Sequence, residues 1–165
     1  MITKQKYESL QALQMYSLEH RFKIYGNLGK KNNRFESISL PEKDYIFGLA
    51  YYNHGIDSQG LLLDNASKLI VGFDHYILGL DCEAKAELIQ KESIAPFYEF
   101  IETENRILAI CELDIFAFDL ECRLIWSSGF RDIVDNYEVI DGKIVSITCS
   151  NGDKNKFELS DGKAL

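Results

Sequence analysis

The chain carries the sequence Leu69-Ile-Val-Gly-Phe-Asp-His-Tyr-Ile-Leu-Gly-Leu-Asp81. Thirty-eight residues later comes Ile107-Leu-Ala-Ile-Cys-Glu-Leu-Asp-Ile-Phe-Ala-Phe-Asp119, which matches it without a gap. Each copy reads as an apolar strand, a short polar turn, a second apolar strand and then an Asp that begins another turn. A third, looser copy joins Ile144-Val-Ser-Ile-Thr-Cys149 to Lys156-Phe-Glu-Leu-Ser-Asp161. A repeat of this kind indicates one supersecondary unit that is used several times.

The segments between the copies also match each other. Tyr98-Glu-Phe-Ile101 stands before the second copy and Tyr137-Glu-Val-Ile140 before the third. Asp141-Gly142 and Asn151-Gly152 lie between apolar runs, where such pairs favour tight hairpin turns because both central residues need positive φ. Each unit is therefore predicted to be a meander of three or four short antiparallel strands.

The copies differ in how much of each strand is apolar. Phe157 and Leu159 alternate with Lys156 and Glu158, which predicts that the third copy has one face in water. The first two copies are apolar at almost every position, so we expect them to be buried on both faces.

The stretch Ile115-Phe-Ala-Phe-Asp-Leu-Glu-Cys-Arg-Leu-Ile-Trp126 resembles a blade of the quinoprotein-type β-propellers. In that pattern a strand ends in Asp, a turn with Gly follows, and Trp closes the next strand. Here Cys122 stands where the Gly is expected. The resemblance covers residues 69–165 and implies blade-like sheets, but three units are too few to close a ring of four or more blades. No cofactor residue carries over.

The N-terminal part of the chain does not show the repeat. Residues 3–18 are predicted to form a helix, capped by Thr3 and packed on the edge or face of a sheet, because apolar residues recur at helical spacing. Residues 20–63 read as short strands. The basic, aromatic-containing stretch at 20–35 is predicted to be a solvated hairpin rather than a nucleic-acid patch.

Together these features predict a mainly β fold. We expect an antiparallel meander of about three repeated hairpin units, as an open or curled sheet or a sandwich, with an N-terminal α-helix. At 165 residues and 46% hydrophobic composition, the chain is expected to form a single domain, residues 1–165.

The cysteines and the absence of long apolar runs indicate the compartment. The four cysteines show no C-x-x-C pair and no close spacing to His, so we expect buried structural thiols and no metal site. They are Cys82, Cys111, Cys122 and Cys149. With no signal peptide pattern and no apolar run of about 18 residues, the expected location is the cytoplasm.

The charge of the chain is strongly asymmetric. Residues 1–73 carry a net charge of +2 and residues 74–165 a net charge of −10. An acidic surface repels nucleic acids and membrane phosphates and attracts basic proteins. We therefore expect no nucleic-acid and no membrane partner.

The sequence offers little catalytic chemistry. The loop His54-Gly55-Ile56-Asp57-Ser58 holds an imidazole, a carboxylate and a hydroxyl, but such residues are also common in turns. The acid pairs Asp81/Glu83 and Asp119/Glu121 and the turn residue His75 are likewise interpreted as surface turn residues. No phosphate loop, dinucleotide fingerprint or nucleophile elbow is present. We expect no catalytic residue and no cofactor.

The resulting hypothesis is a non-enzymatic, cytoplasmic protein-binding protein. Its overall character is similar to small bacterial immunity proteins, which implies neutralisation of a cognate toxin, here a basic nuclease. The candidate partner-binding residues are Glu99, Glu102, Glu104, Glu112 and Asp114. An alternative is a small-ligand-binding protein or hydrolase-like enzyme with a site near His54 and Asp57. A third is a repeat module that closes a propeller by self-association.

Overall fold

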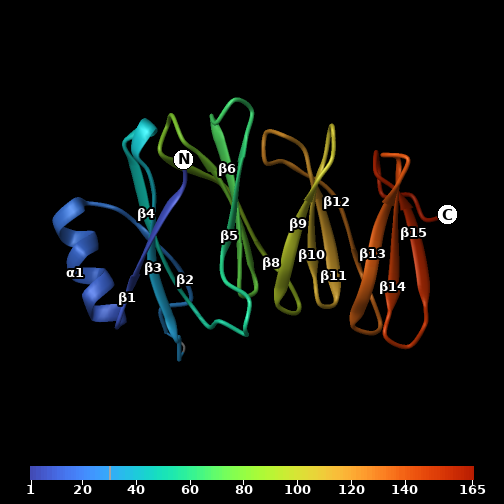
Figure 1. Cartoon of the computed structure of the whole chain (residues 1–165), viewed down its shortest axis with the longest axis horizontal. Coiled ribbons are helices and arrows are strands. Elements are labelled where there is room, and N and C mark those ends of the chain that lie inside the picture. Colours follow the sequence, from blue (N-terminus) through green and yellow to red (C-terminus); the bar gives the residue numbers. More distant parts are fainter. Residues whose placement is uncertain (30) are drawn as a thin grey trace.

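Four β-sheets stand side by side in the order of the sequence, from the N-terminal sheet to the C-terminal one (Figure 1). The structure, a computed structural model, describes residues 1–29 and 31–165; Lys30, in the basic stretch, lies outside the described residues. The first sheet has the order β1-β3-β4-β2. Its strands are β1 (Thr3–Tyr7), β2 (Ile24–Gly26), β3 (Arg34–Leu40) and β4 (Tyr45–Tyr51).

The other three sheets are simple antiparallel meanders. The second contains β5 (Gln59–Leu63), β6 (Lys68–Phe73), β7 (Tyr76–Asp81) and β8 (Ala86–Glu92). The third contains β9 (Phe97–Glu102), β10 (Ile107–Cys111), β11 (Asp114–Phe118) and β12 (Leu124–Gly129). The fourth contains β13 (Val134–Ile140), β14 (Ile144–Cys149) and β15 (Lys154–Glu158). The predicted fold class, mainly β with repeated meander units and one N-terminal helix, is confirmed.

The repeated hairpins fall where the sequence places them. In β6–β7, Phe73 pairs with Tyr76, and in β10–β11, Ile110 pairs with Ile115. Side chains that alternate along one strand enter different cores. Leu69 and Val71 of β6 pack against the first sheet, whereas Ile70 packs against the third.

This alternation produces three hydrophobic cores, one between each pair of neighbouring sheets. The central strands of the second and third sheets are therefore buried on both faces, as predicted. In the fourth sheet only one face is buried, and Lys154 and Lys156 of β15 are exposed. The predicted wet face of the third copy is confirmed.

All four cysteines are free and buried, as predicted. They are distributed over the three cores: Cys82 lies between the first and second sheets, Cys111 and Cys122 between the second and third, and Cys149 between the third and fourth. Burial is the main cause that raises the pKa of the Cys122 thiol to about 12.

The prediction of a helix at residues 3–18 is wrong in its boundaries. The helix, α1, spans Leu10–His20 and is capped by Ser9, whose side chain accepts a hydrogen bond from the Ala12 amide. Residues 3–7 form β1 instead, because they pair with β3, from Thr3–Ser39 to Tyr7–Phe35. Long-range pairing of this kind overrides local helix propensity.

Helix α1 covers the outer face of the first sheet. Leu13 is fully buried there, close to Gly48 of β4. A Cβ at Gly48 would meet Leu13, Phe22 and Ile24 side-chain atoms at 3.4 Å or less, so the glycine makes room for this packing. In the described part of the chain, no helix has the length and apolar character needed to cross a bilayer.

The predicted hairpin at residues 20–35 is also wrong. Strand β2 pairs in parallel with β4, and β3 lies on the opposite side of β4. Strands β2 and β3 therefore do not pair with each other, because β4 lies between them.

The turn after β11 has the geometry that the blade resemblance implies. Cys122, at the expected glycine position, has a φ of 63°, in the left-handed region that favours glycine. Trp126 of β12 then reaches the fourth sheet, where its indole Nε1 donates a hydrogen bond of 3.0 Å to the Leu159 carbonyl. Gly162 packs directly against the indole, which leaves no space for a Cβ at that position. The indole thus joins the third sheet to the fourth.

Candidate functional site

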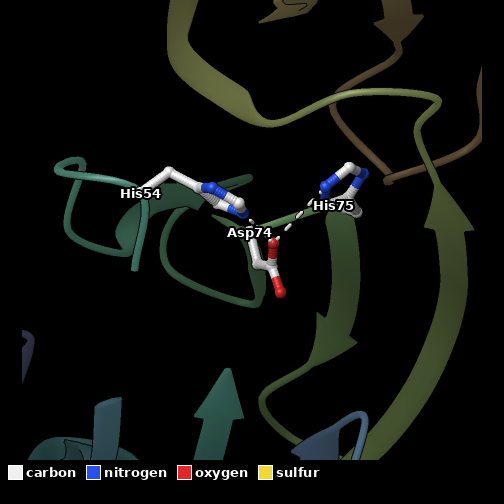
Figure 2. A group of neighbouring side chains, drawn as sticks. All are labelled: His54, Asp74 and His75. Atoms are coloured by element: carbon white, nitrogen blue, oxygen red, sulfur yellow. Dashed lines mark hydrogen bonds and ion pairs between the residues drawn. The ribbon is translucent and has the colours of Figure 1, made fainter. Parts of the chain in front are cut away.

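Two loops bring a carboxylate and two imidazoles together beyond the ends of strands β4 and β6. The β4–β5 connection supplies His54, and the two-residue β6–β7 turn supplies Asp74 and His75 (Figure 2). The Nε2 atom of His54 lies 2.9 Å from Asp74 Oδ1, and the Nε2 atom of His75 lies 3.7 Å from the same oxygen. One ligand atom from each residue lies within 4.8 Å of the others.

The turn that carries Asp74 and His75 is firmly held. Asp74 has a φ of 47°, which Asp tolerates better than most residues in a tight hairpin. Its carbonyl accepts a hydrogen bond of 2.7 Å from the Phe97 amide, and the His75 carbonyl accepts one of 2.8 Å from the Ser93 amide. The connection to the third sheet therefore fixes the position of the turn.

Further contacts orient the three side chains. The Tyr52 amide donates to Asp74 Oδ2 at 3.3 Å, and His75 Nδ1 donates to the Ser93 carbonyl at 3.4 Å. The Asp74 side chain is 12% exposed, whereas those of His54 and His75 are 38% and 32% exposed. The carboxylate is thus shielded by protein, and the two rings are reached by solvent.

The His54 loop does not assemble the nucleophile, base and acid that its sequence offers. The carboxylate beside His54 is Asp74, while Asp57 forms an ion pair of 2.9 Å with Arg34. Ser58 is 2% exposed and turns inward. His54 and Asp57, the two residues named for the alternative site, therefore have different charged partners: Asp74 and Arg34.

Ser58 belongs to a buried polar network that the sequence did not reveal. Its hydroxyl donates to Glu36, a β3 carboxylate that is only 1% exposed, and the Tyr51 hydroxyl donates to the same carboxylate at 3.1 Å. Lys4 Nζ lies 2.9 Å from the Ser58 hydroxyl oxygen. Burial, followed by the charge of Glu36, raises the pKa of Tyr51 to about 12. The network links β1, β3 and β4 to the loop before β5.

The five predicted partner-binding residues do not form one surface. Glu102 and Glu104, at the β9–β10 turn, are exposed and form no ion pair among the described residues. Glu99 accepts a hydrogen bond from Tyr137 of the fourth sheet. Glu112 lies at the opposite end of β10, about 17 Å away for a five-residue strand.

The prediction that Asp114 belongs to an exposed partner-binding surface is wrong, since this residue is only 5% exposed. Its Oδ2 atom accepts a hydrogen bond of 3.1 Å from the Ile94 amide, whereas Oδ1 has no hydrogen-bond partner in the described part of the chain. Burial raises the pKa of the Asp114 carboxyl, and the hydrogen bond from the Ile94 amide acts in the opposite direction.

The acid pairs after β7 and β11 are turn residues, as interpreted from the sequence. The Asp81 carboxylate accepts hydrogen bonds from the Glu83 and Ala84 amides, which together with Lys68 lower its pKa. Asp119 accepts equivalent bonds from the amides of Glu121 and Arg123.

A groove of about 690 Å³ lies between the third and fourth sheets, at the end that carries Glu104. Its walls include Glu104 and Arg106 from the β9–β10 turn, and Lys143 and Glu158 from the fourth sheet. The Arg106 guanidinium crosses the groove and donates to the Ser160 carbonyl at 3.0 Å. The groove therefore offers charges of both signs beside the exposed glutamates.

No family model and no curated protein matches this chain. Among solved structures, dihydro-heme d1 dehydrogenase NirN in complex with DHE is similar, with a TM-score of 0.50 and 7% identity over 79% of this chain and 32% of that one. The β-propeller domain of Cps50 (Swd1) from Myceliophteria thermophila gives a TM-score of 0.49 and 12% identity over 68% of this chain and 38% of that one. The computationally designed Ika8 protein gives a TM-score of 0.48 and 13% identity, over 82% and 46%.

This chain spans between about a third and a half of the length of those structures. At such low identity the likeness concerns the fold alone. The sheets of this chain are blade-like and resemble those of β-propeller-type proteins, as the sequence resemblance implies.

Proposed function

We propose that this chain is a cytoplasmic protein-binding protein that docks a basic protein against an acidic surface on its third sheet. In its most specific form, it is an immunity protein that neutralises a basic nuclease toxin. The observation that carries the proposal is the concentration of negative charge. Residues 97–129, which form the third sheet, contain seven acidic and two basic residues. Asp114 is buried and Asp119 is paired with Arg123, so the proposal rests on the exposed carboxylates of the β9–β10 turn.

The contact region is assigned to the β9–β10 turn and its surroundings. Glu102 and Glu104 are exposed there, and no ion pair among the described residues neutralises them. Unpaired carboxylates attract a basic partner over longer distances than paired ones, because paired charges largely cancel. The neighbouring groove of about 690 Å³ gives a partner side chain a place to be buried.

The mechanism is masking. A nuclease holds nucleic acid with Lys and Arg side chains, and carboxylates that occupy those side chains exclude the phosphates. Long-range attraction raises the association rate, while the buried contacts set the dissociation rate. This division predicts a binding rate that falls steeply as salt rises.

The test is partner capture from the native host with matched charge variants. Glu102→Lys/Glu104→Lys is compared with Glu8→Lys/Glu19→Lys, which makes the same charge change at exposed positions near α1. We expect the first variant to lower the association rate of the captured partner at least tenfold at low salt, and the second to change it less than twofold. We also expect the wild type, but not the first variant, to inhibit the nuclease activity of that partner.

Two results would contradict the proposal. One is a partner that binds both charge variants equally well. The other is a captured partner with an acidic contact surface or with no activity that this chain inhibits.

A further inference from the structure

We propose that His54, Asp74 and His75 form a binding site for a divalent transition-metal ion, with zinc as the ion that fits best. The two imidazole nitrogens lie 2.9 Å and 3.7 Å from Asp74 Oδ1. Zinc binds imidazole nitrogen and carboxylate oxygen at about 2.0–2.2 Å, so neighbouring ligand atoms in a tetrahedral site are about 3.4 Å apart. The two observed separations lie on either side of that value.

The second imidazole is the feature that an ion pair alone does not explain. One histidine is enough to neutralise Asp74, and His54 already lies within hydrogen-bond distance of it. The His75 ring nevertheless turns toward the same oxygen and meets the His54 ring edge-on, with ring centroids 5.6 Å apart (Figure 2). Two imidazoles that converge on one carboxylate oxygen are a donor set for a shared cation.

The ligand types select the class of ion. Calcium and magnesium prefer sites made entirely of oxygen, whereas imidazole suits zinc, copper, nickel and iron. Three protein ligands leave one tetrahedral position free. Both histidine side chains are about one-third exposed, so water or a small ligand can reach that position.

The contacts around the three residues support metal binding. His75 Nδ1 donates to the Ser93 carbonyl, which leaves Nε2 free and directed toward Asp74. The Tyr52 amide donates a hydrogen bond to Asp74 Oδ2, so Oδ1 is the carboxylate oxygen that remains to bind the ion. Histidine ligands of metals are usually oriented in this way by a hydrogen bond from the other ring nitrogen. An ion at this position would tie the β4–β5 loop to the second sheet.

The test is a zinc chloride titration of untagged full-length protein by isothermal titration calorimetry. We expect one zinc ion per chain. His54→Ala and Asp74→Asn are each expected to weaken the affinity more than tenfold, because each removes one of three ligands. Asn tolerates the left-handed backbone of residue 74, so Asp74→Asn keeps the turn while it removes the charge. His20→Ala, which alters the remaining histidine at the end of α1, is the matched control and should leave the affinity unchanged.

Two further measurements separate the site from folding effects. Zinc should raise the melting temperature of the wild type and of His20→Ala, but not of His54→Ala or Asp74→Asn, whose circular dichroism without zinc should match the wild type. Calcium chloride should give no binding. The proposal is overturned if zinc does not bind at micromolar concentration, or if it binds His54→Ala and Asp74→Asn as tightly as the wild type. It is equally overturned if His20→Ala loses the site or calcium binds as well as zinc.

Discussion

The first and fourth sheets are the two ends of the stack, and they meet solvent in opposite ways. In the first, β4 is buried at six of its seven residues, because the neighbouring sheet covers one face and α1 covers the other. In the fourth, β15 is buried only at Phe157. The outer face of an end sheet is therefore either covered by another element or lined with side chains that tolerate water.

The comparison shows how repeated sheets can stop without aggregating. An uncovered apolar face would be an exposed hydrophobic patch. At the first sheet α1 covers the outer face and buries Leu13 beside Gly48. At the fourth sheet the uncovered face carries Thr148 and the exposed Lys154 and Lys156, and no helix is needed. Repeat proteins generally require such terminal layers for solubility.

The largest expected effect concerns the helix that covers the first sheet. Leu13→Ala removes a fully buried side chain, so we expect it to lower the free energy of unfolding by about 2–5 kcal/mol. Urea denaturation followed by circular dichroism measures this change. Leu18→Ala, in the same helix at an 80% exposed position, should change it by less than about 0.5 kcal/mol. Equal effects from the two substitutions would show that α1 does not cover the sheet.

A smaller effect is expected at the junction with the fourth sheet. Trp126→Phe keeps an aromatic ring but removes the Nε1 donor of the Leu159 carbonyl, which leaves a buried acceptor without a partner. We expect a loss of about 1–3 kcal/mol in the same denaturation experiment. Ser127→Ala, at the next and exposed residue of β12, is the control and should lose less than about 0.5 kcal/mol. If Trp126→Phe does not change the free energy of unfolding, the indole hydrogen bond does not stabilise the contact between the third and fourth sheets.

Alkaline pH should produce the most gradual effect. Burial raises the pKa of Tyr51 in the first sheet to about 12, and that of Tyr137 in the fourth to about 12. Because the folded chain holds these phenol protons more tightly than the unfolded chain, their stabilisation is complete below the ordinary pKa of about 10. It is lost as pH rises from about 10 to about 12.

Urea midpoints measured across this pH range should therefore fall. In Tyr51→Phe the fall should be shallower, because this variant lacks one of the two hydroxyls whose pKa is raised by folding. A flat or rising profile in the wild type would contradict the assignment.

The hairpins of the second and third sheets could be predicted from sequence because their signals are local. The strands of each pair are joined by a turn of a few residues, and both strands are apolar throughout. The first sheet could not be predicted in this way. Thr3 pairs with Ser39, and Ile24 pairs in parallel with Gly48, so a helix or another strand separates the partners in the sequence. Local patterns carry no information on such distant pairs.

The candidate site could be predicted only in part, for the same reason. The sequence drew attention to the His54 loop and to His75 as separate turn features. Their meeting at Asp74 depends on the register of β5 against β6, which fixes the loop before β5 beside the β6–β7 turn. The burial of Asp114 was likewise invisible, because an acidic residue at the start of a strand resembles any surface turn residue.

The placement of the cysteines gives the molecule a built-in chemical reporter. Each of the three cores contains at least one free, buried thiol: Cys82 in the first, Cys111 and Cys122 in the second, and Cys149 in the third. A buried thiol with a raised pKa reacts with an alkylating reagent only when its surroundings open. The order in which these four residues become alkylated would therefore record, core by core, the sequence in which neighbouring sheets separate.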